Sequence, residues 1–158
     1  FNGFSFTSAQ LNASMNGTLS LNSNVSGVHT ATETITAPSL TVTATYAGAT
    51  RTRTLTSYTC TMTETPDATY TYLRRYTING DVTSSALSSQ TVHFSTPTPL
   101  VERPSDANPS SGTILIVGAG NSQIRLTALS ASQLKQELDA NGDGTFESSS
   151  TVDWNSVL

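Results

Sequence analysis

Residues 41–66 read TVTATYAGATRTRTLTSYTCTMTETP, and almost every second residue of this segment is a threonine. Threonine is β-branched and favours extended backbone, and an alternation of period two gives each face of a strand its own kind of side chain. Ala47-Gly48-Ala49 interrupts the alternation and Pro66-Asp67-Ala68 ends it, both with residues typical of turns. The segment therefore predicts long β-hairpins.

Folding the chain about these two turns predicts a register. It places Val42 opposite Thr54, Tyr58 opposite Tyr76, Met62 opposite Tyr72 and Cys60 opposite Arg74. One face then collects apolar and aromatic side chains, which we expect to be buried: Val42, Ala44, Tyr46, Tyr58, Cys60, Met62, Tyr70, Tyr72, Tyr76 and Ile78. The other face, which we expect to meet solvent, carries threonines together with Arg51, Arg53 and Arg75. A slip by one residue would exchange the two faces.

Composition extends this prediction to the whole chain. The 158 residues include 28 threonines and 23 serines but one lysine, a poor composition for helices. Further strands are expected after an Asn79-Gly80 type I′ turn (Val82–Ser85) and at Gln90–Ser95, Thr113–Val117, Gln123–Leu129, Leu134–Leu138 and Thr145–Trp154. Residues 130–138 could instead form a helical turn, but alternation favours a strand. We expect an all-β fold, either an antiparallel β-sandwich or a strongly curled sheet with long hairpins.

Four of the six prolines lie between residues 96 and 111. Proline removes a donor from a β-ladder, so this segment is predicted to be a crossing loop and a possible subdomain boundary. The remaining 47 residues are few for a second core. We therefore expect residues 1–158 to form a single β domain.

The charge of the chain excludes some partners. A net charge of −4 offers no basic surface for phosphates, so we expect no nucleic-acid binding. The longest apolar run, Ile114–Val117, is far too short for a membrane span.

The chain begins at Phe1 without methionine, from which we expect processing or excision from a longer protein. One cysteine, Cys60, cannot form an internal disulfide and is expected to be a buried thiol.

The most specific local motif is DANGDGTFE at residues 139–147. Oxygen-bearing residues at relative positions 1, 3 and 5 followed by glycine match the first half of a calcium-binding loop. The candidate ligands are Asp139, Asn141, Asp143, Thr145 and Glu147, with Glu147 in place of the usual twelfth-position glutamate, where Ser150 stands. The alternative is a polar hairpin turn without a metal ion.

Catalytic motifs are scarce in this sequence. His29 and His93 are the only histidines, and neither belongs to a metal-type spacing or a nucleophile elbow. No catalytic residues are assigned, and we expect that the chain is not an enzyme. The five tyrosines, at positions 46, 58, 70, 72 and 76, could form an aromatic platform for a glycan, although a core role is favoured.

A resemblance covers about the last 47 residues. The run Gly112–Gly118, the run Ile124–Ala128, the acidic motif and the terminal Val152-Asp153-Trp154 together resemble bacterial exported or lipoprotein-type β proteins of uncharacterised function. This resemblance implies an extracellular or cell-envelope location and no known reaction.

These observations lead to one expected function and one alternative. Charged residues on edge strands commonly block pairing between sheets, and this chain has few of them. We expect an exported structural or surface protein, a matrix, adhesion or filament-type component, that forms a homo-oligomer or binds a protein partner through strand edges. The alternative is a carbohydrate-binding module with a tyrosine platform.

Overall fold

The computed structural model describes residues 4–7 and 11–156 and consists of antiparallel strands joined by turns. The described residues contain no α-helix, so the predicted all-β fold is confirmed. The strands are β1 (Phe4–Thr7), β2 (Leu11–Gly17), β3 (Ser20–Gly27), β4 (Thr30–Tyr46), β5 (Ala49–Asp67), β6 (Thr71–Ser84), β7 (Gln90–Glu102), β8 (Ser111–Val117), β9 (Gln123–Ala128), β10 (Gln133–Asp139) and β11 (Ser148–Asp153). Short 3₁₀ turns are η1 (Ser85–Leu87), η2 (Ala119–Asn121) and η3 (Trp154–Ser156).

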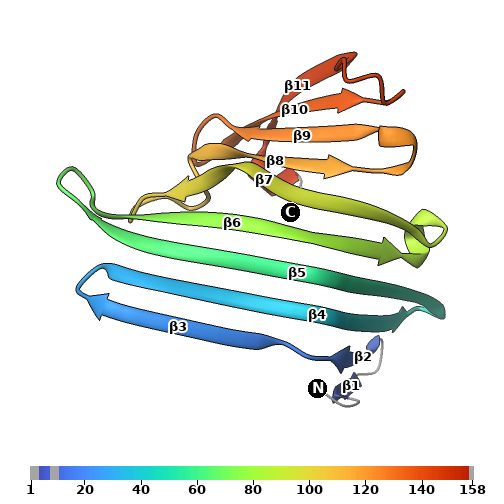
Figure 1. Cartoon of the computed structure of the whole chain (residues 1–158). Coiled ribbons are helices and arrows are strands. Elements are labelled where there is room, and N and C mark those ends of the chain that lie inside the picture. The colour runs from blue at the N-terminus through green and yellow to red at the C-terminus, as the bar shows by residue number, and fades with distance from the viewer. Residues whose placement is uncertain (1–3, 8–10, 157–158) are drawn as a thin grey trace.

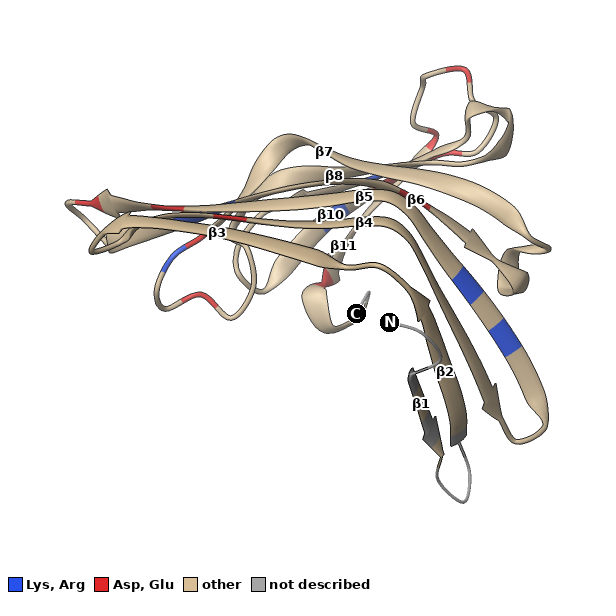
Figure 2. Ribbon diagram, turned by 60° about the horizontal axis from the view of Figure 1, so that its bottom comes forward, with Lys and Arg blue, Asp and Glu red and all other residues tan. Residues whose placement is uncertain are grey.

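The strands form one open sheet rather than two packed sheets (Figure 1). The order is β1-β2-β4-β5-β6-β7-β8-β9-β10-β11, and β3 pairs with β4 beyond the end of β2. Of the two expected architectures, the curled sheet with long hairpins is therefore the one observed. Figure 2 shows that the ends of β2, β4 and β5 bend away from the rest of the sheet.

The predicted register of the first long hairpin is wrong by one residue. Val42 lies opposite Arg53 and Ala44 opposite Arg51, because the turn consists of Ala47 and Gly48 alone, both with positive φ (49° and 81°). A two-residue turn of this kind matches the twist of the flanking strands. Arg51 and Arg53 consequently share the face of Val42 and Ala44, and the face predicted for them is wrong. The other face is a ladder of threonine hydroxyl pairs at 3.1, 3.2 and 2.8 Å: Thr41 with Thr54, Thr43 with Thr52 and Thr45 with Thr50.

The register of the second hairpin, between β5 and β6, is also wrong, by four residues. Met62 lies opposite Tyr76 and Cys60 opposite Ile78. The turn lies two residues later than predicted, because the Asp67 carboxylate accepts the Thr69 and Tyr70 amides and closes the turn there. A shift by four residues preserves the face, so Cys60, Met62, Tyr76 and Ile78 still share one side of the sheet.

Two other expectations are corrected in the middle of the chain. Asn79-Gly80 forms no turn: β6 continues through it, with Asn79 paired to both Thr59 and Ser95. The chain reverses instead at η1, where the Ser84 hydroxyl accepts the Ala86 amide. Of the predicted crossing loop, residues 96–102 belong to β7, and the register is irregular on both sides of Thr98, where prolines lack the ladder donor. Only residues 103–110 connect β7 to β8.

The C-terminal strands match the predicted ones closely. β8, β9 and β10 occupy the expected segments, and residues 133–139 are a strand rather than a helical turn. β11 begins at Ser148 instead of Thr145 because residues 145–147 belong to the acidic loop.

The core lies at the C-terminal end of the sheet and not among the tyrosines. Buried apolar side chains among the described residues are Ala37, Leu100, Ala128, Leu134 and Trp154. The last three form a cluster with the partly buried Val152. None of the five tyrosines is buried, and Tyr46 is 61% exposed. Cys60 is half-buried rather than enclosed. A single layer has no second sheet to cover either face, which explains why long strands bury so little.

Candidate functional site: an acidic loop

The acidic loop connects β10 to β11 and is organised by Asp139, the last residue of β10. This side chain is fully buried, and its two carboxylate oxygens accept the amides of Gly142 at 2.7 Å and Gly144 at 2.9 Å. Burial of a carboxylate is costly unless hydrogen bonds compensate it. The two amides provide this compensation and fold the loop around the aspartate.

Asn141 and Asp143 continue the same pattern along the loop. The Asn141 side-chain oxygen accepts the Asp143 amide at 2.8 Å, and Asp143 Oδ1 accepts the Thr145 amide at 2.7 Å. The hydrogen bond from the Thr145 backbone is the largest cause that lowers the pKa of Asp143. This carboxylate is therefore charged at neutral pH, as a metal ligand must be.

Glu147 closes the loop. Its amide donates to the Leu138 carbonyl, and its carboxylate accepts the Ala140 amide, both at 2.9 Å. As a result, Asp139, Asp143 and Glu147 each place one carboxylate oxygen within 4.8 Å of the others, and this cluster could hold a metal ion. Asn141 and Thr145, the other two predicted ligands, lie in the same loop and are hydrogen-bonded to Asp143.

The charge of Glu137, in contrast, is balanced by two cationic side chains outside the loop. Its carboxylate is 2.7 Å from both Arg125 Nε and Lys135 Nζ, and the Arg125 hydrogen bond, followed by that of Lys135, lowers its pKa to about 2. The guanidinium of Arg125 also lies 4.1 Å from the ring centre of Phe146, a loop residue. Three carboxylates therefore remain in the loop, and within residues 4–7 and 11–156 none of them forms an ion pair.

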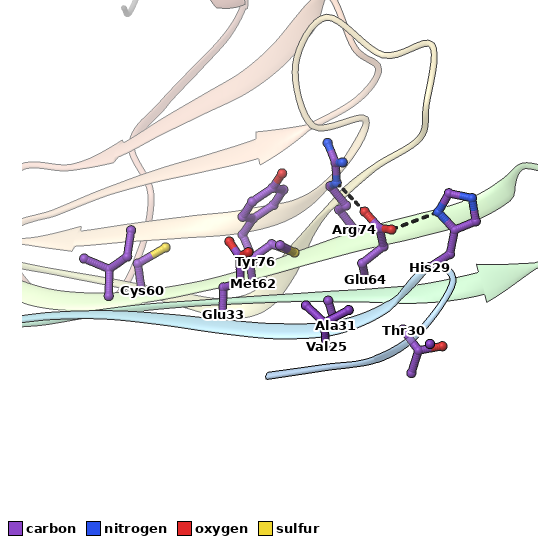
Figure 3. Close-up of a pocket in the computed structure, with 12 residues that line it drawn as sticks. Val25, His29, Thr30, Ala31, Glu33, Cys60, Met62, Glu64, Arg74 and Tyr76 are labelled. Atoms are coloured by element: carbon purple, nitrogen blue, oxygen red, sulfur yellow. Dashed lines mark hydrogen bonds and ion pairs between the residues drawn. The ribbon is translucent and has the colours of Figure 1, made fainter. Parts of the chain in front are cut away.

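The surface also contains a groove that the sequence analysis did not predict. It occupies about 550 Å³ over β3, β4, β5 and β6, and Ile35 is among the residues that line it. Figure 3 shows the side chain of Met62 and the thiol of Cys60 in the groove. The sequence placed Cys60, Met62 and Tyr76 on one face but gave no sign of a groove, because most of the other lining residues come from β3 and β4 and join them only through the observed register.

One end of the groove carries a polar network centred on Glu64. The Glu64 carboxylate is 2.9 Å from His29 Nδ1 and 2.8 Å from Arg74 Nε, and these two hydrogen bonds lower its pKa (Figure 3). The His29 ring stacks on Tyr72 at 4.5 Å. Arg74 also approaches Glu102 at 3.7 Å, and the Tyr76 hydroxyl donates to Glu102. His29 is thus part of a network rather than an isolated side chain.

These features define an all-β protein with one open antiparallel sheet and a candidate cation-binding loop. No protein-family model, curated protein or solved structure matches this chain. Of the helical segments in the described residues, none has the length and apolar character needed to cross a membrane.

Proposed function

We propose that this chain is an exported, non-enzymatic structural protein of a surface, matrix or filament, and that it assembles by pairing the open edges of its sheet with those of further copies. The observation that carries this proposal is the open, single-layered sheet. Each free edge exposes unpaired backbone N–H and C=O groups, which template the addition of another strand.

The composition of the two edges supports assembly. β3 is exposed along its whole length and contains no charged residue and no proline. β1, the other strand on this side of the sheet, also contains no charged residue. At the opposite edge, β11 contains one charged residue, Asp153. Because the two edges differ, a contact between them is head-to-tail, and such contacts build open filaments unless the rotation closes a ring.

The tyrosine platform receives less support. Tyr46 lies at the tip of the β4–β5 hairpin, whereas the Tyr70 ring lies under the Arg103 guanidinium and Tyr72 stacks on His29. These rings are dispersed or occupied, so a flat sugar would find no continuous aromatic surface. Glycan binding that depends on the tyrosines would favour this alternative over assembly.

Lysines placed on β3 should abolish assembly. Sedimentation across the micromolar range is expected to show association of the natural chain and a monomer for Asn22→Lys combined with Asn24→Lys, because edge lysines block strand pairing. Ala119→Lys combined with Asn121→Lys, in the exposed η2 turn, adds the same charge away from the edges and should associate like the natural chain. A natural chain that stays monomeric at all concentrations would contradict the proposal.

We further propose that the ion held by the acidic loop is calcium, which prefers several oxygen ligands around a tight turn. Calcium at 100 times its Kd should stabilise the fold by about 2.7 kcal/mol, because it binds only the folded loop. The measurement is the melting temperature in calcium and in chelator. Asp143→Ala should remove the difference, whereas Asp153→Ala, outside the loop, should keep it. Equal melting temperatures for the natural chain would reduce the loop to a polar turn.

A further inference from the structure

The second surface that favours self-association is the bent end of the β4–β5 hairpin, here called the arm (residues 42–53). Pairing between β5 and β6 begins at Arg53, so residues 49–52 of β5, at the tip of the arm, extend beyond the end of β6. Arg51 and Arg53 lie there beside Val42, Ala44 and Tyr46, around a hollow of about 300 Å³. Tyr46 and both arginines are exposed.

The two arginines of the arm form no ion pair in the described part of the chain. The ion pairs there involve Arg74, Arg103, Arg125 and Lys135, but neither Arg51 nor Arg53. Figure 2 shows basic residues on the bent end of β5 with no acidic residue on the ribbon around them. Two like charges on one small apolar surface favour an acidic partner.

The groove has the opposite charge. Glu33, Glu64 and the adjoining Glu102 contribute three carboxylates against the single guanidinium of Arg74, so carboxylates outnumber guanidinium groups there. Among these carboxylates, Glu33 has no cationic partner in residues 4–7 and 11–156, and it accepts a 3.4 Å hydrogen bond from the Ser23 hydroxyl. It lies in register with Met62 and Tyr76, on the apolar part of the groove (Figure 3).

The arm of a chain cannot reach its own groove. Glu33 and Tyr46 are near opposite ends of β4, and thirteen residues of strand span about 40 Å. The acidic, apolar groove and the basic, apolar arm are therefore complementary only between copies.

We propose that the arm of one copy docks into the groove of a second copy, with Arg51 and Arg53 against Glu33 and Tyr46 against the apolar part of that groove. This inference rests on the proposed self-assembly and adds a second contact to it, separate from the strand edges. The contact is head-to-tail, so it propagates in the same open manner as edge pairing.

Charge reversal tests the contact. One variant carries Arg51→Glu and Arg53→Glu, and the other carries Glu33→Lys. Sedimentation at low salt should show at least a tenfold weaker association for each variant alone, and recovery to within about threefold of the natural chain when the two are mixed, because the mixture restores opposite charges. Weakening without recovery on mixing would overturn the docking.

A cross-link distinguishes arm docking from edge pairing. Cys60 lines the groove and is the chain's single cysteine, so a copy with Ala49→Cys and Cys60→Ser carries its thiol only on the arm. Mixed with the natural chain and a short bismaleimide, it should give a covalent heterodimer, identified by different mass tags, whose yield falls when Glu33→Lys is introduced into the natural copy. Association that is lost in the β3 lysine variant but gives no such heterodimer would overturn the docking and leave edge assembly intact. A natural chain that never associates would overturn both.

Discussion

Trp154→Ala is expected to lower the free energy of unfolding by about 3–5 kcal/mol, the cost typical of removing a large buried aromatic side chain. Trp154 is 5% exposed and packs with Ala128, Leu134 and Val152. It is fixed by two hydrogen bonds, from its amide to the Ser132 carbonyl and from its indole Nε1 to the Ser130 carbonyl. Urea unfolding followed by far-UV circular dichroism measures the loss, because the variant has no tryptophan for fluorescence.

Two control variants separate packing from other effects. Trp154→Phe keeps much of the ring volume but loses the bond to Ser130, so it should cost less than the alanine variant. Leu87→Ala, at a side chain 48% exposed, should change stability by no more than about 0.5 kcal/mol. A loss below about 1 kcal/mol for Trp154→Ala would contradict a core at the C-terminal end of the sheet.

Gly112→Ala is expected to cost about 3 kcal/mol, through backbone strain together with steric overlap. Gly112 lies at the start of β8 with φ at 109°, a conformation that other residues rarely adopt. A Cβ there would overlap the Pro99 carbonyl oxygen and lie 2.6 Å from Leu100 Cα. Since both contacts are backbone, β7 and β8 would have to separate beside Leu100, one of the few buried side chains.

Gly48→Ala is the matched control, because it measures the cost of a positive φ without any steric overlap. Gly48 also has a positive φ, at 81°, but nothing lies within 4 Å of the position that a Cβ would occupy there. It should therefore show only the conformational penalty of about 1–2 kcal/mol. Chemical unfolding of both variants gives the difference, which reports the close approach of β7 and β8. Equal losses of stability for Gly112→Ala and Gly48→Ala would contradict the prediction that β7 lies too close to Gly112 for a side chain.

The acidic loop could be predicted because its information is local. Asp139, Asn141, Asp143 and Glu147 lie within nine residues, and each hydrogen-bonds to a backbone amide of the same loop. The alternation of side chains likewise depends only on the period of a strand, so the bounds of β8, β9 and β10 were predicted well. What remained wrong in the C-terminal part, the start of β11, followed from the length of the loop.

The groove could not be predicted, because its residues come together through pairings that the sequence leaves degenerate. Threonine pairs with threonine equally well when a hairpin slips by two residues, so the repeated threonines do not select a register.

The sequence by itself determined an all-β chain, long hairpins with threonine faces, a low content of charged residues and a cluster of acidic residues at 139–147, since each depends on residue type and short-range spacing. The tertiary structure alone decided that the sheet stays a single layer, that the core is at Trp154, and that Arg53 lies opposite Val42 and Glu33 opposite Met62. The physical reason is that turn geometry sets these pairings: Ala47 adopts a positive φ that its residue type disfavours, and the Asp67 carboxylate fixes where the next hairpin reverses.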